Sequence, residues 1–355
     1  MSLRAVSLYS GAGGLDIGFE RAGFEIVFAN EMNADAAATW KANRPSDNAV
    51  MCVGDIANQT QSLAQLRNIG VVFGGPPCQG FSVAGKMDKG DERNAQVDCF
   101  LDVVDRVKPC VFLMENVEAL ATHQKWESVR MRMLQRADEM QYDTEIALCN
   151  ASRYGVPEKR SRMLFVGVKR NTGKASAFRE EMLKYTSEPK TLRETLLKVG
   201  AFGTPANPDT CTARVVLAKK PVKRSSAYSG MLVNGAGRPL KLDSTAPTLT
   251  ASMGGNSTPI IDQRALNNSG LRNWFECLYE RIGEKGYPQI EVPSYVRRLT
   301  LKEAAAIQTF PDNYVFKGSI CSQYRQIGNA VPCLMAEAAA RAIRDAYFTP
   351  ELKDA

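Results

Sequence analysis

Histidine and paired cysteines are nearly absent from this sequence. His123 is the only histidine in 355 residues, and the nine cysteines include no Cys-x-x-Cys pair. A structural zinc site needs several such ligands at short spacing, and an odd number of cysteines does not suit a disulfide scaffold. We therefore expect no metal site, and a reducing compartment such as the cytoplasm. His123 follows Ala121-Thr122 at a predicted helix start, so we expect a surface residue and regard a cysteine protease as poorly supported.

Long apolar runs and a strong charge imbalance are also missing. No window approaches the ~18 consecutive apolar residues of a membrane-spanning helix, and the chain enters a strand pattern at once, so we expect no membrane contact and no signal peptide. Hydrophobic residues make up 44% and charged residues 23%, as in an ordinary globular protein. The formal net charge of +7 is compatible with a polyanionic partner but does not require one.

The most distinctive segment is a rigid loop around a cysteine. It reads Gly74-Gly75-Pro76-Pro77-Cys78-Gln79-Gly80-Phe81-Ser82 and follows the apolar run 71–73, a predicted buried strand. Open α/β sheets bind ligands at the carboxyl ends of such strands, and two prolines fix the backbone before the thiol. A lone cysteine is more often a buried structural residue. The rigid loop favours the alternative, which is a presented nucleophile.

A strand, a glycine-rich turn and a helix open the chain. The strand pattern covers 5–9, the turn covers 10–16, and apolar residues at helical spacing follow. This order is typical of the nucleotide-binding start of a doubly wound fold. The glycine spacing departs from Gly-x-Gly-x-x-Gly, however, and such turns also serve ordinary strand-to-helix packing.

Two acidic residues end the next predicted strands. Glu31 follows the strand 25–30 and is placed to accept hydrogen bonds from ribose hydroxyls. Its alternative role is a solvated charge at the start of a helix. Asp55 follows the strand 50–53 and is placed either to accept from an adenine amino group or to cap a helix near 62–67.

The character of the sequence changes after residue 168. Strand and helix patterns no longer alternate, yet apolar residues keep recurring, so disorder is not expected. We predict an α/β fold with a doubly wound, mostly parallel sheet in a catalytic and cofactor-binding domain made of 1–168 and 297–355. A second, smaller and irregular domain is predicted for 169–296. Basic residues cluster in this second domain, at Lys219, Lys220, Lys223 and Arg224.

Four blocks of this sequence, in this order, closely resemble the motifs of the cytosine-C5 DNA methyltransferases. They are 9–15, 75–82, 115–117 and 160–162, and the third block places Glu115 after a predicted strand among apolar neighbours. Weaker family blocks follow at 298–300, 308–311 and 328–332.

The resemblance covers nearly the whole chain except roughly 169–296. Within that region, Pro247-Thr248-Leu249-Thr250 resembles the Thr-Leu element of the family's target recognition domain. One departure concerns Glu158, which stands where the family usually has glutamine.

The resemblance implies a Rossmann-like methyltransferase with a covalent mechanism. Cytosine C5 is too electron-poor to attack a methyl donor, and a thiolate that adds to C6 makes C5 nucleophilic. By resemblance Cys78 is that thiolate, Glu115 holds a proton on cytosine N3, and Arg162 binds the cytosine O2. Arg160 is implied to fix the loop or a phosphate. The alternative for both arginines is a basic edge without base contact.

The implied methyl donor is S-adenosylmethionine. Glu31 would bind its ribose and Asp55 its adenine amino group, and Ile56 would pack on the ring. No metal is needed, because the sulfonium is already an activated leaving group. The implied cofactor-binding residues are Tyr9, Ser10, Gly11, Ala12, Gly13, Gly14, Glu31, Met32, Asp55, Ile56, Pro77, Asn329, Ala330 and Val331.

The implied substrate is double-stranded DNA. A thiol cannot reach C6 inside a stacked duplex, so the target cytosine must swing out, and we expect the loop 81–94 to close over it. The region 169–296 would read the base sequence. DNA contacts are implied for Gln79, Ser82, Lys86 and Arg93. The likeness to bacterial modification methylases implies a monomer, located in the prokaryotic cytoplasm at the nucleoid, with a cognate restriction endonuclease acting separately.

Three rival functions differ from this one in testable ways. An RNA cytosine methyltransferase would share the machinery, but its branch of the family carries a Cys-Phe-Thr element that this chain lacks. An inactive DNA-binding subunit would be expected to lose Cys78, Glu115 or Arg162, and all three are present. A nicotinamide-dependent oxidoreductase is supported by the glycine turn alone.

Overall fold

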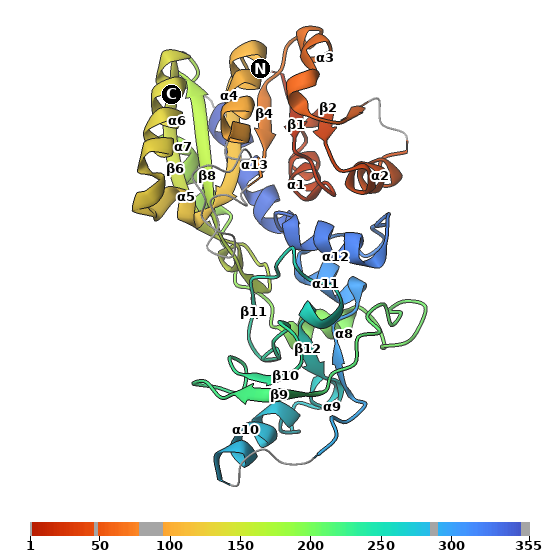
Figure 1. The fold of residues 1–355 in the computed structure, drawn as a ribbon. Coiled ribbons are helices and arrows are strands. Elements are labelled where there is room, and N and C mark those ends of the chain that lie inside the picture. Colours follow the sequence, from red (N-terminus) through yellow and green to blue (C-terminus); the bar gives the residue numbers. More distant parts are fainter. Residues whose placement is uncertain (1, 46–48, 78–94, 285–289, 349–355) are drawn as a thin grey trace. The chain divides into compact units, whose positions relative to one another are not determined.

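The computed structural model describes residues 2–45, 49–77, 95–284 and 290–348. Its fold, as far as these residues show it, is drawn in Figure 1. Within this part of the chain, no helix is both long enough and apolar enough to cross a membrane.

The chain forms two compact units. The first contains Met1–Gly155, Arg160–Glu188 and Val331–Ala355, and the second contains Val156–Lys159 and Pro189–Ala330. Each unit is therefore built from segments that lie far apart in the sequence. The assignment of catalysis to one part of the chain and DNA reading to the other stays a prediction.

A seven-stranded sheet organises the first unit, in the order β3-β2-β1-β4-β5-β8-β6. Strands β1 to β5 pair in parallel, whereas β8 is antiparallel to both of its neighbours. This arrangement confirms the predicted doubly wound α/β fold. The strands are β1 (Arg4–Leu8), β2 (Glu25–Glu31), β3 (Val50–Val53), β4 (Val71–Gly74), β5 (Val111–Val117), β6 (Tyr142–Asn150) and β8 (Ser161–Lys169).

Helices cover this sheet, as expected for a sheet whose central strands β1, β4 and β5 are mostly buried. The side chains of Phe73, Phe112 and Phe165 are fully buried and belong to β4, β5 and β8, which are adjacent in the sheet. The α-helices of this unit are α1 (Gly14–Arg21), α2 (Ala34–Ala42), α3 (Thr60–Ala64), α4 (Gln96–Val107), α5 (Glu118–Thr122), α6 (Glu127–Glu139), α7 (Ser176–Lys184) and α13 (Cys333–Tyr347). Short 3-10 turns are η1 (Ile56–Asn58), η3 (Gln124–Trp126) and η4 (Ala151–Arg153).

The last helix of the chain packs directly against the first. A Cβ placed on Gly18 of α1 would lie 2.4 Å from the backbone carbon of Ala336 on α13, so only glycine permits this approach. Pro332 separates α13 from the helix that precedes it in the chain, α12 (Ile320–Asn329).

The second unit contains short strands and helices around a small core. The core includes Leu232, Ile260, Phe275, Leu278 and Val296. The unit's elements are β7 (Glu158–Lys159), α8 (Leu192–Lys198), β9 (Leu217–Val222), β10 (Met231–Val233), β11 (Ala246–Pro247), η5 (Gly255–Ser257), β12 (Ile260–Asp262), α9 (Gln263–Asn267), α10 (Trp274–Glu284), β13 (Val296–Arg298), α11 (Leu301–Ile307) and α12 (Ile320–Asn329). Its strands pair as β10-β9, β11-β7 and β12-β13.

Candidate functional site

The carboxyl ends of the parallel strands define one edge of the sheet in the first unit. The strand order reverses between β1 and β4, and ligands of doubly wound folds bind at such a reversal. At this point Gly74 approaches β1 so closely that an added Cβ would lie 2.3 Å from the Leu8 carbonyl oxygen. Several predicted site features lie at or just beyond these strand ends. They are the glycine turn, Glu31, Asp55, Glu115 and the start of the loop 75–82, here called the proline loop, of which residues 75–77 are described.

The glycine turn is wound tightly between β1 and α1. Tyr9, Gly11 and Gly13 all have positive φ angles, of 53°, 55° and 87°. The Gly13 N–H donates to the Ser10 carbonyl at 2.8 Å, and the Ser10 N–H donates to the Asn30 carbonyl of β2 at 3.0 Å. A Cβ placed on Gly11 would meet no atom within 4 Å, so the turn has open space over its backbone. This geometry is that of a cradle for a ligand at the start of a helix.

Glu31 is bound to the glycine turn. One carboxylate oxygen accepts a hydrogen bond from the Gly11 N–H at 2.8 Å, and the other accepts from the Asn33 N–H at 2.7 Å. Burial raises the pKa of Glu31, and the backbone hydrogen bonds act in the opposite direction. The carboxylate therefore contacts both the glycine turn and the residue before α2, and its contact with a ribose stays a prediction.

Asp55 caps the short turn that follows β3. Its carboxylate accepts from the Ala57 N–H at 3.0 Å, so it caps η1 and not the later helix α3. Ile56 is 2% exposed, whereas Met32 at the end of β2 is 67% exposed. Whether Asp55 and Ile56 hold an adenine stays a prediction.

Asn30 is a supporting residue that the sequence patterns did not single out. Its side-chain amide donates to the carbonyl oxygens of Cys52, at 3.1 Å, and Gly54, at 2.9 Å. It thereby fixes the end of β3, directly before Asp55. The only sign of this role in the sequence was an asparagine at the end of a predicted strand, directly before Glu31.

Glu115 and Arg162 form an ion pair. Arg162 Nε lies 2.8 Å from a Glu115 carboxylate oxygen, and the two side chains are 13% and 12% exposed. The other carboxylate oxygen lies 2.9 Å from the place where a Cβ on Gly75 would sit. The antiparallel pairing of β5 with β8 sets Val117 opposite Arg162 and so brings the two charged side chains to the same edge. Two residues predicted to act together thus lie together, beside the first residue of the proline loop.

A hydrogen bond joins β5 to the proline loop. The side-chain amide of Asn116, a residue 1% exposed, donates to the Pro76 carbonyl at 3.2 Å, while its oxygen accepts from the Val117 N–H at 2.9 Å. This contact fixes the backbone two residues before Cys78. Asn116 lies within a family block, but no role was predicted for it.

The other predicted site residues are distributed over the two units, or they lie outside the described residues. Arg160 is 2% exposed, and its carbonyl accepts from the Ala151 N–H at 2.9 Å. Pro77 is half-buried, and Val331 of the first unit is buried. Asn329 and Ala330 belong to the second unit, so their part in a shared cofactor site stays a prediction. The remaining predicted residues lie outside the described residues, namely Cys78, Gln79, Ser82, Lys86 and Arg93.

A buried polar cluster lies next to the turn, on α1 and α2. Trp40 Nε1 donates to the carboxylate of Asp16, which is fully buried, at 2.7 Å. Burial raises the pKa of Asp16, and the positive charge of Arg44 opposes the shift. Arg44 also pairs with Glu20 through two hydrogen bonds and stacks on the Trp40 ring.

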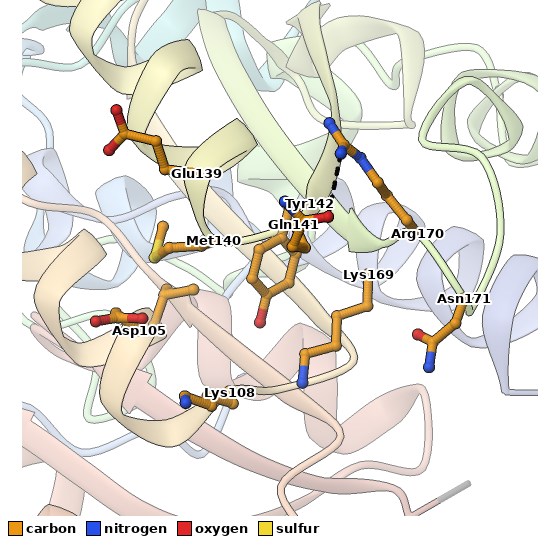
Figure 2. A pocket seen from close by; sticks show the side chains of 10 residues that line it. Asp105, Lys108, Glu139, Met140, Gln141, Tyr142, Lys169, Arg170 and Asn171 are labelled. Atoms are coloured by element: carbon orange, nitrogen blue, oxygen red, sulfur yellow. Dashed lines mark hydrogen bonds between the residues drawn. The ribbon is translucent and has the colours of Figure 1, made fainter.

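A surface hollow of about 520 Å³ lies at the opposite edge of the same sheet. Figure 2 shows Asp105, Glu139, Lys108 and Lys169 around it, so both charge signs are present. Arg170 donates there to Gln141 at 3.2 Å. Since α4 and β8 end at this edge, the hollow is not part of the candidate site. In the described part of the chain, no group of three or more His, Cys, Asp or Glu residues is arranged to hold a metal ion.

Comparison with known proteins identifies the family. The profile of the family described as C-5 cytosine-specific DNA methylase matches residues 3–345. The chain belongs to this family. It is therefore a DNA cytosine-5-methyltransferase, and it uses S-adenosylmethionine as its methyl donor. The nicotinamide-dependent alternative is wrong.

Curated relatives and solved structures agree with this family. The chain is 29% identical to Type II methyltransferase M1.HphI of Haemophilus parahaemolyticus, over 97% of this chain and 87% of that protein. It is 32% identical to Type II methyltransferase M.PspPI of Psychrobacter sp. (strain TA137), over 96% of this chain and 79% of that protein. The crystal structure of S. pombe Dnmt2 methyltransferase covers 97% of this cytosine-C5 methylase and 99% of its own chain, with a TM-score of 0.65 and 17% identity, and shows the shared fold.

Proposed function

We propose that this methylase modifies one specific duplex DNA sequence, through a covalent bond between Cys78 and C6 of a flipped-out cytosine, as the modification enzyme of a restriction-modification system. The ion pair between Glu115 and Arg162, at the carboxyl edge beside Gly75, is the observation that carries the proposal. It sets a carboxyl group and a guanidinium side by side, next to the loop that leads to Cys78.

The proposed chemistry begins with addition of the Cys78 thiolate to C6. The new S–C6 bond would move electron density to C5, which would then take the methyl group as the bond between that group and the sulfur of the donor breaks. The proton that remains on C5 leaves to a base, the electron pair restores the ring, and the S–C6 bond breaks. A thiolate suits both ends of this sequence, because it attacks well and leaves readily.

Glu115 and Arg162 would hold the cytosine ring during addition. A carboxyl group at N3 that keeps a proton there, together with a guanidinium at O2, stabilises the negative charge that the ring acquires. The two side chains are largely buried, and interactions between charges are stronger in such a place than in water. Arg160 would fix the neighbouring loop or a phosphate.

The glycine turn and Glu31 fit the methyl donor. Open space over Gly11 leaves room for the methionine part, and the Glu31 carboxylate is held where it can accept from ribose hydroxyls. Asp55 and Ile56 would bind the adenine. S-adenosylmethionine, when bound, supplies an activated methyl group on its sulfonium.

Double-stranded DNA would be held by the Cys78 loop and the second unit. Gln79, Ser82, Lys86 and Arg93 would contact it, and the second unit would read the bases. The names of the curated relatives, Type II methyltransferases of bacteria, support the modification role. By the same likeness the enzyme would act as a monomer in the cytoplasm, at the nucleoid, with a separate cognate endonuclease.

Bisulfite sequencing tests this proposal directly. DNA from a methylation-deficient bacterial host that expresses the chain should contain 5-methylcytosine in one sequence context. The Cys78→Ser variant, expressed to the same level, should leave that context unmethylated. Methylation by the variant at the level of the wild type would overturn the nucleophile, and methylation without a sequence context would overturn the modification role.

A further inference from the structure

The segment 246–251, here called the Thr-Leu segment, is bound to the short strand β7 within the second unit. β7 pairs in parallel with β11, and Ala246 stands opposite Glu158. The Ala246 N–H donates to the Pro157 carbonyl at 2.8 Å, and the Thr248 hydroxyl donates to the Lys159 carbonyl at 2.8 Å. A strand pair of two residues makes few ladder bonds, so side chains must contribute to holding it.

The side chain of Glu158 provides the shortest of these contacts. It is fully buried, and a carboxylate oxygen accepts from the Leu249 N–H at 2.6 Å. Leu249 lies two residues beyond the end of β11, where the strand ladder has stopped. A hydrogen bond to an ionised acceptor is shorter and stronger than one between neutral groups. The Glu158 carboxylate thus binds the backbone of the Thr-Leu segment at a residue that the hydrogen bonds of the strand pair no longer reach.

Helix α12 holds the Thr-Leu segment at a second point. A Cβ placed on Gly328 would lie 2.2 Å from the Thr250 carbonyl oxygen and 2.8 Å from the Ala251 nitrogen. The helix backbone therefore lies directly on the segment, and only glycine allows that. Gly328 belongs to a family block, and this packing gives a structural reason for a glycine there.

The consequence is a fixed presentation of two hydroxyl side chains. The Leu249 side chain is buried, whereas Thr248 and Thr250 are exposed. The Thr250 hydroxyl lies 2.8 Å from the Ser252 hydroxyl. Threonine hydroxyls contact both phosphates and base edges in protein–DNA complexes, and their use depends on a backbone that does not shift.

We propose that Glu158 is a positioning residue. Its carboxylate fixes the Thr-Leu segment, through the Leu249 N–H, for contact with duplex DNA. The proposal rests on the proposed function, in which the second unit reads DNA. It also explains how this chain tolerates glutamate where the family usually has glutamine, because either side chain offers an oxygen to the same N–H.

The test compares Glu158→Ala with Glu158→Gln in the full-length enzyme. The substrate is a duplex that contains the sequence found by bisulfite sequencing, next to duplexes with one base pair changed. Glu158→Ala removes the acceptor from a buried N–H, so the KM for DNA should rise about tenfold and methylation of the changed duplexes should increase. The KM for S-adenosylmethionine should stay unchanged. Glu158→Gln should restore both DNA properties.

Glu303→Ala is the matched control for a purely structural loss. Glu303 is a buried glutamate of the same unit that pairs with Arg297 and accepts from the Thr300 N–H. This variant should lower the melting temperature without changing the KM for DNA. Wild-type KM and selectivity in Glu158→Ala, or equal damage in Glu158→Gln, would overturn the proposal. Failure of the wild type to methylate any duplex would instead overturn the proposed function.

Discussion

Among single residues, the Glu115 carboxylate occupies the most constrained position of the site. Arg162 lies on one of its oxygens and Gly75 beside the other. A side chain at position 75 would clash with the Glu115 carboxylate, and an aspartate at position 115 would be too short to keep the ion pair with Arg162. The residue types follow from this geometry as much as from the chemistry.

Replacing Glu115 by glutamine keeps the shape and removes the acid. We expect kcat to fall about a hundredfold or more, because the amide cannot hold a shared proton at cytosine N3. The affinity for S-adenosylmethionine should stay within about twofold of the wild type, measured by calorimetry. Glu118→Gln, three residues away on the exposed face of α5, is the control and should keep wild-type turnover. Wild-type kcat in Glu115→Gln would contradict the assigned role.

The buried carboxyl of Asp16 makes a prediction about stability and pH. Its pKa is raised by burial above the usual value of 3.8, so the folded protein keeps this proton to higher pH than the unfolded chain does. The stabilising contribution of Asp16 is therefore complete below about pH 4 and is lost as the pH rises through the folded-state pKa. Asp16→Asn has no proton to lose, and its amide oxygen can still accept from Trp40.

Urea unfolding of both proteins from about pH 4 to about pH 8 measures this effect. We expect the stability of Asp16→Asn relative to the wild type to increase as the pH rises from the usual aspartate pKa toward the raised pKa of folded Asp16. A difference that does not depend on pH would show that Asp16 is not held protonated by burial.

Motif order revealed Glu115 and Arg162, but it could not reveal their contact. Each lies in a family block, and the blocks are more than forty residues apart in the sequence. Their contact depends on the antiparallel register between β5 and β8, which no local pattern contains. Asn30 was missed for a similar reason, since its partners lie on the neighbouring strand β3.

Among the elements, the parallel strands of the first unit could be predicted from the sequence, and the short strands of the second unit could not. The strands from β1 to β5 each contain a run of apolar residues, and polar or glycine residues stand at their carboxyl ends, so the edge that carries the site followed from the sequence. The strands β7, β10 and β12 have two or three residues. A period of two cannot be recognised in so few residues. The pair β7-β11 is also held by a side chain, because Glu158 accepts from the Leu249 N–H.

The segment 263–284 has a structural role in the second unit. Its helices α9 and α10 follow β12, and Trp274 and Phe275 pack into the core of the second unit. Asp262 caps α9 and also accepts from the Trp274 N–H at 2.9 Å. The aromatic residues of this segment are visible in the sequence, but their place in the core of the unit is not.

Strand β9 and the residues after it carry the exposed basic cluster of Lys219, Lys220, Lys223 and Arg224. If Lys219 and Lys220 contact phosphates, replacing both by alanine should reduce the slope of log K against log salt by about 2, because each phosphate contact releases counterions. Filter binding across a salt series measures the slope. Replacing Lys41 and Lys184, two exposed lysines of the first unit, is the control and should leave it unchanged. An unaltered slope in the β9 variant would remove this strand from the DNA contacts.

For the whole molecule, the central claim is a covalent bond between the Cys78 sulfur and cytosine C6. The described residues include Pro77, directly before Cys78 in the sequence. Asn116 fixes the backbone at Pro76, and the pair of Glu115 and Arg162 stands beside Gly75. The bond itself can be captured, because release of the enzyme requires loss of a proton from C5.

The most direct measurement uses duplex DNA with fluorine in place of hydrogen at C5 of the target cytosine. Fluorine cannot leave as a proton does, so the methylated adduct should persist as a protein–DNA complex that survives denaturation. Mass spectrometry of its peptides should place the modified base on Cys78, and Cys78→Ser should form no complex. A complex through another residue, or none from the active wild type, would contradict the account.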